Sequence, residues 1–144
     1  GGASIGFMWP LPRAPALAFW RDVAEGVKRG ARALLVAEAG AERIVGTAQL
    51  ILALPDNQPH RADVAKVLVH RSARRHGVAA RLMSAVDATA RAEHRTLLVL
   101  DAVTGGAAER LYARTGWQRV GEIPRYALMP DGAPCATTYF YKEV

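Results

Sequence analysis

One stretch of this sequence restricts the fold more than any other. An apolar segment, a basic loop, an amphipathic segment and a second apolar segment follow one another directly. Residues 63–69 are predicted as a strand, residues 78–94 as a helix and residues 96–101 as a second strand, apolar throughout its middle as expected when both faces are covered. Two strands joined by one helix pair in parallel through a right-handed crossover. The chain is therefore predicted to be an α/β protein.

The remaining elements follow from the same periodicities. Helices are predicted over residues 14–30 and 106–114, and strands over residues 32–39, 43–54, 117–121 and 137–142. The turn from Gly40 to Glu42 joins the first two strands as a hairpin. This order predicts a mixed sheet with helices on both faces. Because the 144 residues contain no repeat or linker, we expect one domain spanning residues 1–144.

The loop before the central helix is rich in arginine and opens directly into that helix. Its cationic side chains are Arg71, Arg74, Arg75 and Arg81. The first N–H groups of a helix have no intrahelical acceptor, and the helix dipole is positive there, so such a loop favours anions. Gly77 and Ala79 keep the backbone accessible. The spacing matches neither the P-loop nor the dinucleotide fingerprint. The loop therefore predicts a pyrophosphate site of another class.

Two motifs give this site a family resemblance. Residues 74–79 fit Arg/Gln-x-x-Gly-x-Gly/Ala, the acetyl-coenzyme A signature of the GNAT N-acetyltransferases. Residues 105–117 resemble the later family segment Asn-x-x-Ala-x-x-x-Tyr-x-x-x-Gly-Phe, with Trp117 as the aromatic residue and Gly105 where asparagine is common. The resemblance implies the GNAT acyl-CoA N-acyltransferase fold. That fold has a mixed, mostly antiparallel sheet with flanking helices and one parallel strand pair that splays apart.

The resemblance also implies that acetyl-CoA is the co-substrate. Its pantetheine arm would enter between the splayed strands and pair with backbone groups, and its pyrophosphate would bind the arginine loop. The cofactor-binding residues implied in this way are Leu68, Val69, Arg74, Arg75, His76, Gly77, Val78, Ala79, Ala80, Arg81, Ala108 and Tyr112. His76 is expected to contact phosphate or solvent rather than to act as a catalytic base.

Acetyl transfer to an amine needs a proton acceptor for the amine and a donor for the departing thiolate. Tyr112 stands at the family's tyrosine position and is the candidate general acid; the alternative is that its ring only packs in the core. Asp63 is the leading candidate for the base or amine anchor, because family members place an acid at this distance before the loop. Asp101, at the end of a predicted strand, is the second candidate, and a water molecule is the third.

Further matches point to one branch of the family, the bacterial tabtoxin resistance proteins, which acetylate a small amino-acid-like toxin. These matches lie in residues 1–8, 61–64, 121–124, 126, 130–132 and 139–140. Relatives carry a first strand and helix before the position of Gly1, so we expect this domain to lack both. The acceptor pocket is expected in residues 1–13, 55–61 and 124–134, with Trp9, Trp20 and Tyr126 as candidate lining residues.

Composition limits the partners, location and metal content that we expect for this protein. Net charge is +6, from 19 Lys+Arg against 13 Asp+Glu, but the cations cluster only around the loop, so no nucleic-acid partner is expected. No apolar run reaches the ~20 residues of a membrane span, and a cytoplasmic location is expected. Cys135 is the one cysteine and is expected to be an incidental loop or strand-entry residue. The histidines show no metal-ligand spacing, so no metal is predicted.

The sequence therefore predicts an acetyl-CoA-dependent N-acetyltransferase acting on a primary amine of a small molecule, such as an amino-acid-like toxin or antibiotic. The alternatives are acetylation of a protein, peptide or polyamine, and a non-catalytic module that binds acyl-CoA. A homodimer is compatible with the resemblance, and the identity of the amine is left open.

Overall fold

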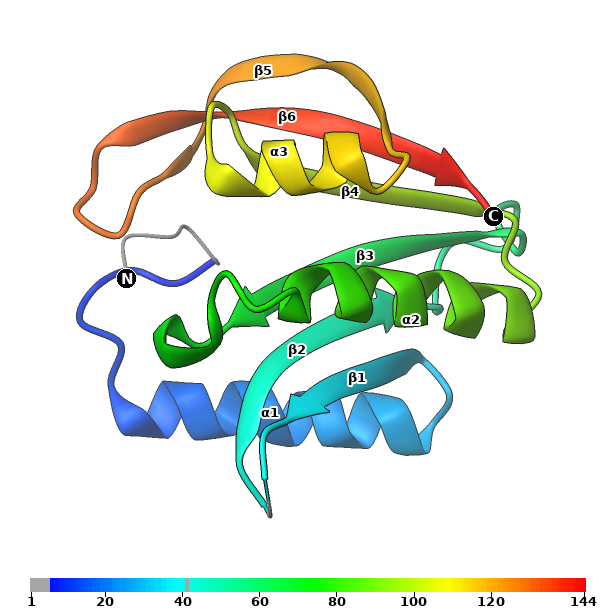
Figure 1. The fold of residues 1–144 in the computed structure, drawn as a ribbon, viewed down its shortest axis with the longest axis horizontal. Coiled ribbons are helices and arrows are strands. Elements are labelled where there is room, and N and C mark those ends of the chain that lie inside the picture. The colour runs from blue at the N-terminus through cyan, green and yellow to red at the C-terminus, as the bar shows by residue number, and fades with distance from the viewer. Residues whose placement is uncertain (1–5, 41) are drawn as a thin grey trace.

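The computed structural model describes residues 6–40 and 42–144 (Figure 1). The helices are α1 (Arg13–Lys28), the short 3₁₀ helix η1 (Arg71–Ala73), α2 (Val78–Ala92) and α3 (Ala107–Arg114). The strands are β1 (Arg32–Glu38), β2 (Ile44–Ile51), β3 (Arg61–Val69), β4 (Leu97–Val103), β5 (Gln118–Leu128) and β6 (Pro134–Glu143). Residues 1–5 and 41, which carry part of the expected acceptor segment and hairpin turn, lie outside the described residues.

The six strands form one sheet in the order β1-β2-β3-β4-β6-β5. Every neighbouring pair is antiparallel except β3 and β4, which are joined through α2 and run parallel. Helices α2 and α3 lie on one face of the sheet and α1 on the other (Figure 1). The predicted α/β class, strand–helix–strand crossover and mixed sheet are confirmed.

The parallel pair holds together over a short distance. Arg61, Ala62 and Asp63 pair with Leu97, Leu98 and Val99, and beyond these the described residues of β3 and β4 form no further pair. Both strands continue, β3 to Val69 and β4 to Val103. The two strands therefore separate at their carboxyl ends, which confirms the splayed pair expected from the family resemblance.

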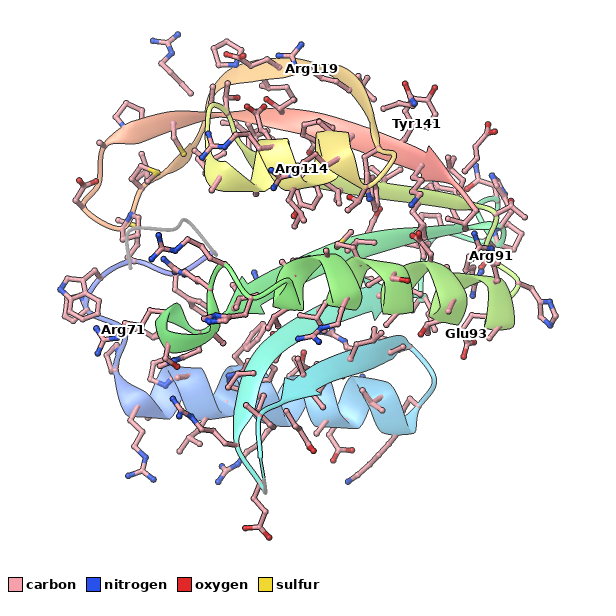
Figure 2. All side chains as sticks on the ribbon, in the orientation of Figure 1. Arg71, Arg91, Glu93, Arg114, Arg119 and Tyr141 are labelled. Carbon is pink, nitrogen blue, oxygen red and sulfur yellow. The ribbon has the colours of Figure 1, made fainter. Side chains whose placement is uncertain are left out.

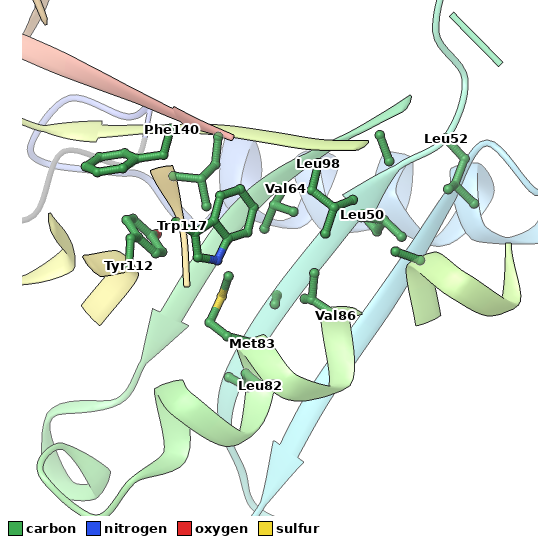
Figure 3. Close-up of a cluster of buried hydrophobic side chains, with 14 of the residues drawn as sticks. Leu50, Leu52, Val64, Leu82, Met83, Val86, Leu98, Tyr112, Trp117 and Phe140 are labelled. Atoms are coloured by element: carbon green, nitrogen blue, oxygen red, sulfur yellow. The ribbon is translucent and has the colours of Figure 1, made fainter. Parts of the chain in front are cut away.

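The main hydrophobic core lies between the sheet and the helices α2 and α3. Figure 3 shows Leu50, Val64 and Leu98 of the sheet meeting Met83 and Val86 of α2. Along β4 the side chains alternate: Leu98 and Leu100 are buried, whereas Leu97 and Val99 are half-buried. The prediction that this strand is covered on both faces is wrong, because α1 packs along β1 and leaves the same face of β4 open.

The last hairpin is longer than predicted. Strand β5 runs to Leu128 through Pro124, and β6 begins at Pro134. Prolines usually indicate a loop, but β5 is an edge strand, where a missing N–H need not break a ladder bond. A register shift between Ile123 and Ala127, with Arg125 at φ 50°, absorbs the irregularity. Part of the expected acceptor loop is therefore strand.

Candidate active site

The start of α2 presents unpaired backbone donors. Gly77 caps the helix at φ 74°, no side chain caps the first turn, and that turn holds no acidic residue. The N–H of Arg81 donates to the carbonyl of Gly77 over 3.1 Å. The N–H groups of Val78, Ala79 and Ala80 therefore precede the first helical bond and have no acceptor within the helix. The geometry of this end of α2 is suited to an anion, and anion binding itself stays a prediction.

Arginine side chains surround these donors, and none of them forms an ion pair among the described residues. Arg74, Arg75 and Arg81 are exposed, as is His76, and the Arg74 Nε donates to the carbonyl of Val69 over 3.4 Å. Figure 2 shows Arg71 at this end of the helix, whereas Arg91 and Glu93 mark the opposite end. The Val78 side chain is buried in the core, so its backbone alone is available to a ligand.

The hydrogen bonds between β2 and β3 determine which backbone groups of β3 face the gap between β3 and β4. The N–H of His70 donates to the carbonyl of Val45 over 2.8 Å, and Leu68 and Val69 stand opposite Thr47 and Gly46. Because bonded and non-bonded pairs alternate in an antiparallel ladder, the backbone of Leu68 faces β2 and that of Val69 faces the gap. Of the two residues expected to pair with the cofactor arm, Val69 has the suitable orientation.

Tyr112 reaches the core from α3. It is 5% exposed, and its ring lies 5.9 Å from Trp117 and 5.6 Å from Phe140, centroid to centroid. Burial, and then the negative charge of Asp101, raise the pKa of Tyr112 to about 12. The phenol therefore keeps its proton at neutral pH and can donate a hydrogen bond. Ala108, one turn earlier, packs at the margin of the same core.

The two candidate acids lie on the α1 face of the sheet, on either side of the parallel pair. Asp63 stands opposite Val99, and its carboxylate lies 2.5 Å from the guanidinium of Arg61. Asp101 lies two residues after Val99 on the same face and accepts a hydrogen bond of 2.8 Å from the Thr137 hydroxyl. Asp63 is therefore already in a close ion pair, whereas Asp101 accepts a hydrogen bond from a neutral hydroxyl and interacts electrostatically with Lys66.

A tyrosine pair completes this face. Tyr139 stands opposite Asp101 on β6, and its hydroxyl lies 2.8 Å from that of Tyr126. The hydrogen bond with Tyr126 is the main cause that raises the pKa of Tyr139 to about 12, with smaller effects from burial and from Asp101 and Asp63. Tyr126 was predicted as a pocket residue, but Tyr139 and Thr137 were not. Tyr139 lies between buried Thr138 and Phe140 in an alternating stretch, which was the available signal, whereas Thr137 is itself buried and gave none.

Lys66 brings a positive charge to the same region. Its Nζ lies 5.6 Å from the ring of Phe7 and 5.7 Å from that of Phe19. Burial lowers the pKa of Lys66, and the attraction of Asp101 opposes this effect. The α1 face near the gap therefore carries both signs of charge beside aromatic rings.

Other sequence candidates lie apart from this site. The Cys135 Sγ donates to the carbonyl of Ala127 over 3.4 Å within the last hairpin, which is a structural contact. A groove of about 700 Å³ lies between β1 and α2, with His76 and Arg81 at its lining, and is separate from the gap between β3 and β4. Among the described residues no group of His, Cys, Asp or Glu is suited to a metal ion. No helix in the described part of the chain could span a membrane.

This architecture, with one splayed parallel pair and an anion-binding helix start beside it, is that of the acyl-CoA N-acyltransferase fold. The family model of the acetyltransferase (GNAT) domain matches residues 30–119, and the chain belongs to this family.

Solved structures share the fold. The ribosomal-protein-alanine N-acetyltransferase of Brucella melitensis is 22% identical, with 89% of this chain and 78% of that chain covered and a TM-score of 0.79. The Salmonella typhimurium protein yncA, solved with acetyl-CoA, is 19% identical, with 98% and 78% covered and a TM-score of 0.79. An aminoglycoside 6′-N-acetyltransferase, solved with coenzyme A, is 14% identical, with 85% and 78% covered and a TM-score of 0.68.

Proposed function

We propose that this protein transfers the acetyl group of acetyl-CoA to a primary amine of a small molecule by direct attack in a ternary complex. The observation that carries the proposal is the junction of three features at the gap: the open start of α2, the edge of β3 at Val69 that is not paired with β4, and Tyr112 near Asp101. The crystal structures of yncA and of the aminoglycoside enzyme, which hold acetyl-CoA and coenzyme A, support this choice of co-substrate.

The residues present fit acetyl-CoA. The N–H groups of residues 78–80 and the exposed side chains of Arg74, Arg75 and Arg81 would hold the pyrophosphate. The backbone of Val69 would pair with the amide groups of the pantetheine arm in the manner of an added strand. Bound in this way, the thioester would supply an activated acetyl group for transfer.

The transfer step needs no covalent enzyme intermediate. The amine nitrogen attacks the thioester carbonyl carbon, a C–N bond forms, and the C–S bond breaks with its electron pair on sulfur. The proton lost by the amine passes to a carboxylate or to water. We favour Asp101 over Asp63 for this role, because Arg61 already neutralises Asp63. Asp101 also interacts with Tyr112, which places its charge near the candidate donor.

Tyr112 is proposed to stabilise the departing sulfur. A phenol with a pKa of about 12 is a weaker acid than a thiol, whose ordinary pKa is ~8.5. Complete proton transfer from Tyr112 to the thiolate is therefore unfavourable. A hydrogen bond donated to the developing negative charge remains favourable in a buried environment, and this is the role we assign to the hydroxyl group.

A small zwitterionic amine, such as an amino-acid-like toxin, fits the α1 face. Asp101 offers a partner for an ammonium group, and Lys66 adds positive charge to the same region. This agrees with the resemblance to the tabtoxin resistance proteins. Acetylation of a protein N-terminus is the second candidate, because the Brucella melitensis neighbour is a ribosomal-protein-alanine acetyltransferase. The net charge of +6 opposes polyamines.

Ligand-induced stabilisation tests the cofactor site. Acetyl-CoA at 100 times its Kd should stabilise the wild-type protein by ~2.7 kcal/mol in thermal unfolding. Gly77→Glu places a negative charge at the helix start and should abolish this stabilisation. Gly30→Glu is the matched control, because Gly30 also has a positive φ of 69° and open space around it. Equal stabilisation of both variants would contradict the proposed site.

Release of free thiol in the presence of single amines then tests the chemistry. Amino acids, an alanine-terminated peptide and an aminoglycoside form the panel. Tyr112→Phe and Asp101→Asn should each lower kcat by ~10²-fold or more while the Kd for acetyl-CoA stays within a few-fold. Turnover by Asp101→Asn at the wild-type rate, with Asp63→Asn inactive, would reverse the assignment of the two acids.

A further inference from the structure

The chain has three lysines, and one of them lies on β3 beside the gap. They are Lys28, Lys66 and Lys142. Lys28 is exposed on α1, where its Nζ lies 2.7 Å from Glu25, and the Nζ of Lys142 lies 2.6 Å from Asp87. Lys66 differs from both because it stands three residues beyond the last pair of β3 with β4, where the two strands have begun to separate.

A bulge in β3 determines the position of Lys66. Between its pairings at Ala65 and Leu68, β3 advances by three residues while β2 advances by two. Lys66 adopts φ 51° within this bulge, and its carbonyl accepts a hydrogen bond of 3.2 Å from the Thr47 hydroxyl. A positive φ is costly for a residue other than glycine, so the surrounding structure must hold this conformation in place.

The bulge reverses which residues of β3 enter the core. Ala62 and Val64 are buried in the core before the bulge, and Val67 packs against the same core after it. Strict alternation would have placed residue 66 in the core with Ala62 and Val64. The extra residue instead sends Lys66 to the α1 face, and bulges of this kind often redirect a side chain next to an active site.

The surroundings of the Lys66 amine favour its neutral form over that of an exposed lysine. Its Nζ lies near the rings of Phe7 and Phe19. Burial lowers the pKa of Lys66, and the smaller attraction of Asp101, two residues beyond the last pair on β4, opposes this effect. Only the neutral amine has a lone pair for nucleophilic attack, so the lowered pKa increases the reactive fraction at a given pH.

We propose that Lys66 is a self-acetylation site, whose amine accepts the acetyl group of acetyl-CoA when no acceptor amine is bound. This inference rests on the proposed function, because it needs acetyl-CoA held by the start of α2 and by Val69. An arm that runs from the start of α2 past Val69 points toward the last β3–β4 pair at Asp63, and Lys66 lies between these two residues of β3. The thioester at the end of the arm would then be within reach of the Lys66 amine.

The transfer to Lys66 needs no reactant besides acetyl-CoA. The neutral Nζ attacks the thioester carbonyl carbon, a C–N bond forms, and the C–S bond breaks with its electron pair on sulfur. The nitrogen loses one proton, which passes to the Asp101 carboxylate or to water, and coenzyme A leaves as the thiolate. The product is a neutral amide, so the modification removes the positive charge that faces Asp101.

The mass of the protein tests this proposal. The full chain incubated with acetyl-CoA and no added amine should gain the mass of one acetyl group, and peptide mapping should place it on Lys66. Lys66→Arg keeps the positive charge without a nucleophilic amine and should gain nothing. Lys28→Arg is the matched control and should be modified like the wild type.

The rate of labelling tests whether the acetyl group is delivered from the bound co-substrate. Labelling at Lys66 should be at least ~10-fold faster than at Lys28, because a bound thioester and a neighbouring amine react as an intramolecular pair. Gly77→Glu should slow labelling and abolish the stabilisation by acetyl-CoA together, because both need the same site. The rate per molecule should not depend on protein concentration.

Other outcomes would contradict the proposal. Acetylation from free solution favours Lys28, whose side chain is 71% exposed, so labelling of Lys28 at the rate of Lys66 would overturn it. A rate per molecule that rises with protein concentration would show transfer between molecules and would also overturn it. An unchanged mass, with stabilisation by acetyl-CoA and thiol release to an added amine intact, would exclude Lys66 and leave the proposed function standing. Absence of that stabilisation would contradict the proposed function and this inference with it.

Discussion

The two faces of the sheet differ in how far the side chains of the same strands are buried. On the α2 and α3 face, side chains of β2, β3, β4 and β6 are buried in one continuous core. On the α1 face, α1 buries Val23 and Gly26, while Leu17, Trp20 and Val27 are exposed. The open face also carries Asp63, Asp101, Tyr139 and Lys66, and it leaves β4 half-exposed. Most of the buried apolar side chains therefore lie on the α2 and α3 face, and the α1 face has room for the polar groups proposed to act on a ligand.

The largest loss of unfolding free energy should come from breaking an ion pair on the α2 and α3 face, which we call the covered face. The Lys142 Nζ of β6 lies 2.6 Å from Asp87 of α2 and 2.7 Å from the carbonyl of Thr115, with little solvent access. Asp87→Ala leaves this ammonium buried and unpaired and should lower the free energy of unfolding by ~3–5 kcal/mol in urea. The double variant Asp87→Ala/Lys142→Met should recover part of the loss. A loss below ~1 kcal/mol would mean that solvent reaches the pair.

Substitutions at two neighbouring leucines of β4 allow the contribution of each face to stability to be compared directly. Leu98 is fully buried on the α2 face, and Leu97 is half-buried on the opposite face. Leu98→Ala should cost ~2–5 kcal/mol of unfolding free energy, because it leaves a cavity in the core. Leu97→Ala removes the same atoms from the same strand and should cost about 1 kcal/mol. Equal losses in the same urea titration would show that the α1 face is covered in solution.

The smallest predicted effect is the pH dependence of the unfolding free energy that Tyr112 causes at alkaline pH. Its folded pKa of about 12 lies above the ordinary value of 10.0, so the folded protein retains a proton that the unfolded chain releases. The stability linked to this proton is complete below pH 10 and is lost as the pH rises from 10 to 12, a change of about 2–3 kcal/mol.

The control for this prediction is a pair of phenylalanine variants. Tyr112→Phe should flatten the stability profile above pH 10. Tyr139→Phe should change it less, because solvent screens this tyrosine on the open face. If Tyr139→Phe removes the larger part of the alkaline loss, the contrast between the faces does not extend to these two tyrosines.

The sequence predicted the covered face well, because local patterns determine it. The apolar stripe of α2 and the position of Gly77 located the helix start at Val78, where the structure has it. The end was predicted two residues too late, since His94 adopts φ 55°, which no apolar pattern reveals. The hairpin of β1 and β2 and the crossover to β4 followed from short-range periodicity in the same way.

The open face was predicted less well, because it depends on pairing between distant strands. Tyr139 meets Tyr126 only through the register of β5 with β6, which shifts between Ile123 and Ala127. The partner that distinguishes Asp63 from Asp101 is Arg61, two residues away on the same strand face. Motif distance alone favours Asp63, and the ion pair that neutralises it depends on side-chain geometry that the sequence does not contain.

The short parallel pairing has a mechanical consequence. The sheet consists of two leaves, β1-β2-β3 and β4-β6-β5, joined edge to edge by three residue pairs. The crossover helix and the Lys142–Asp87 contact bridge the same seam from the covered face. A ligand that pairs with Val69 in the gap would lengthen this seam. Binding of such a ligand should reduce the motion of the two leaves relative to each other. The first sign of this should be slower hydrogen exchange at the amide of Val69.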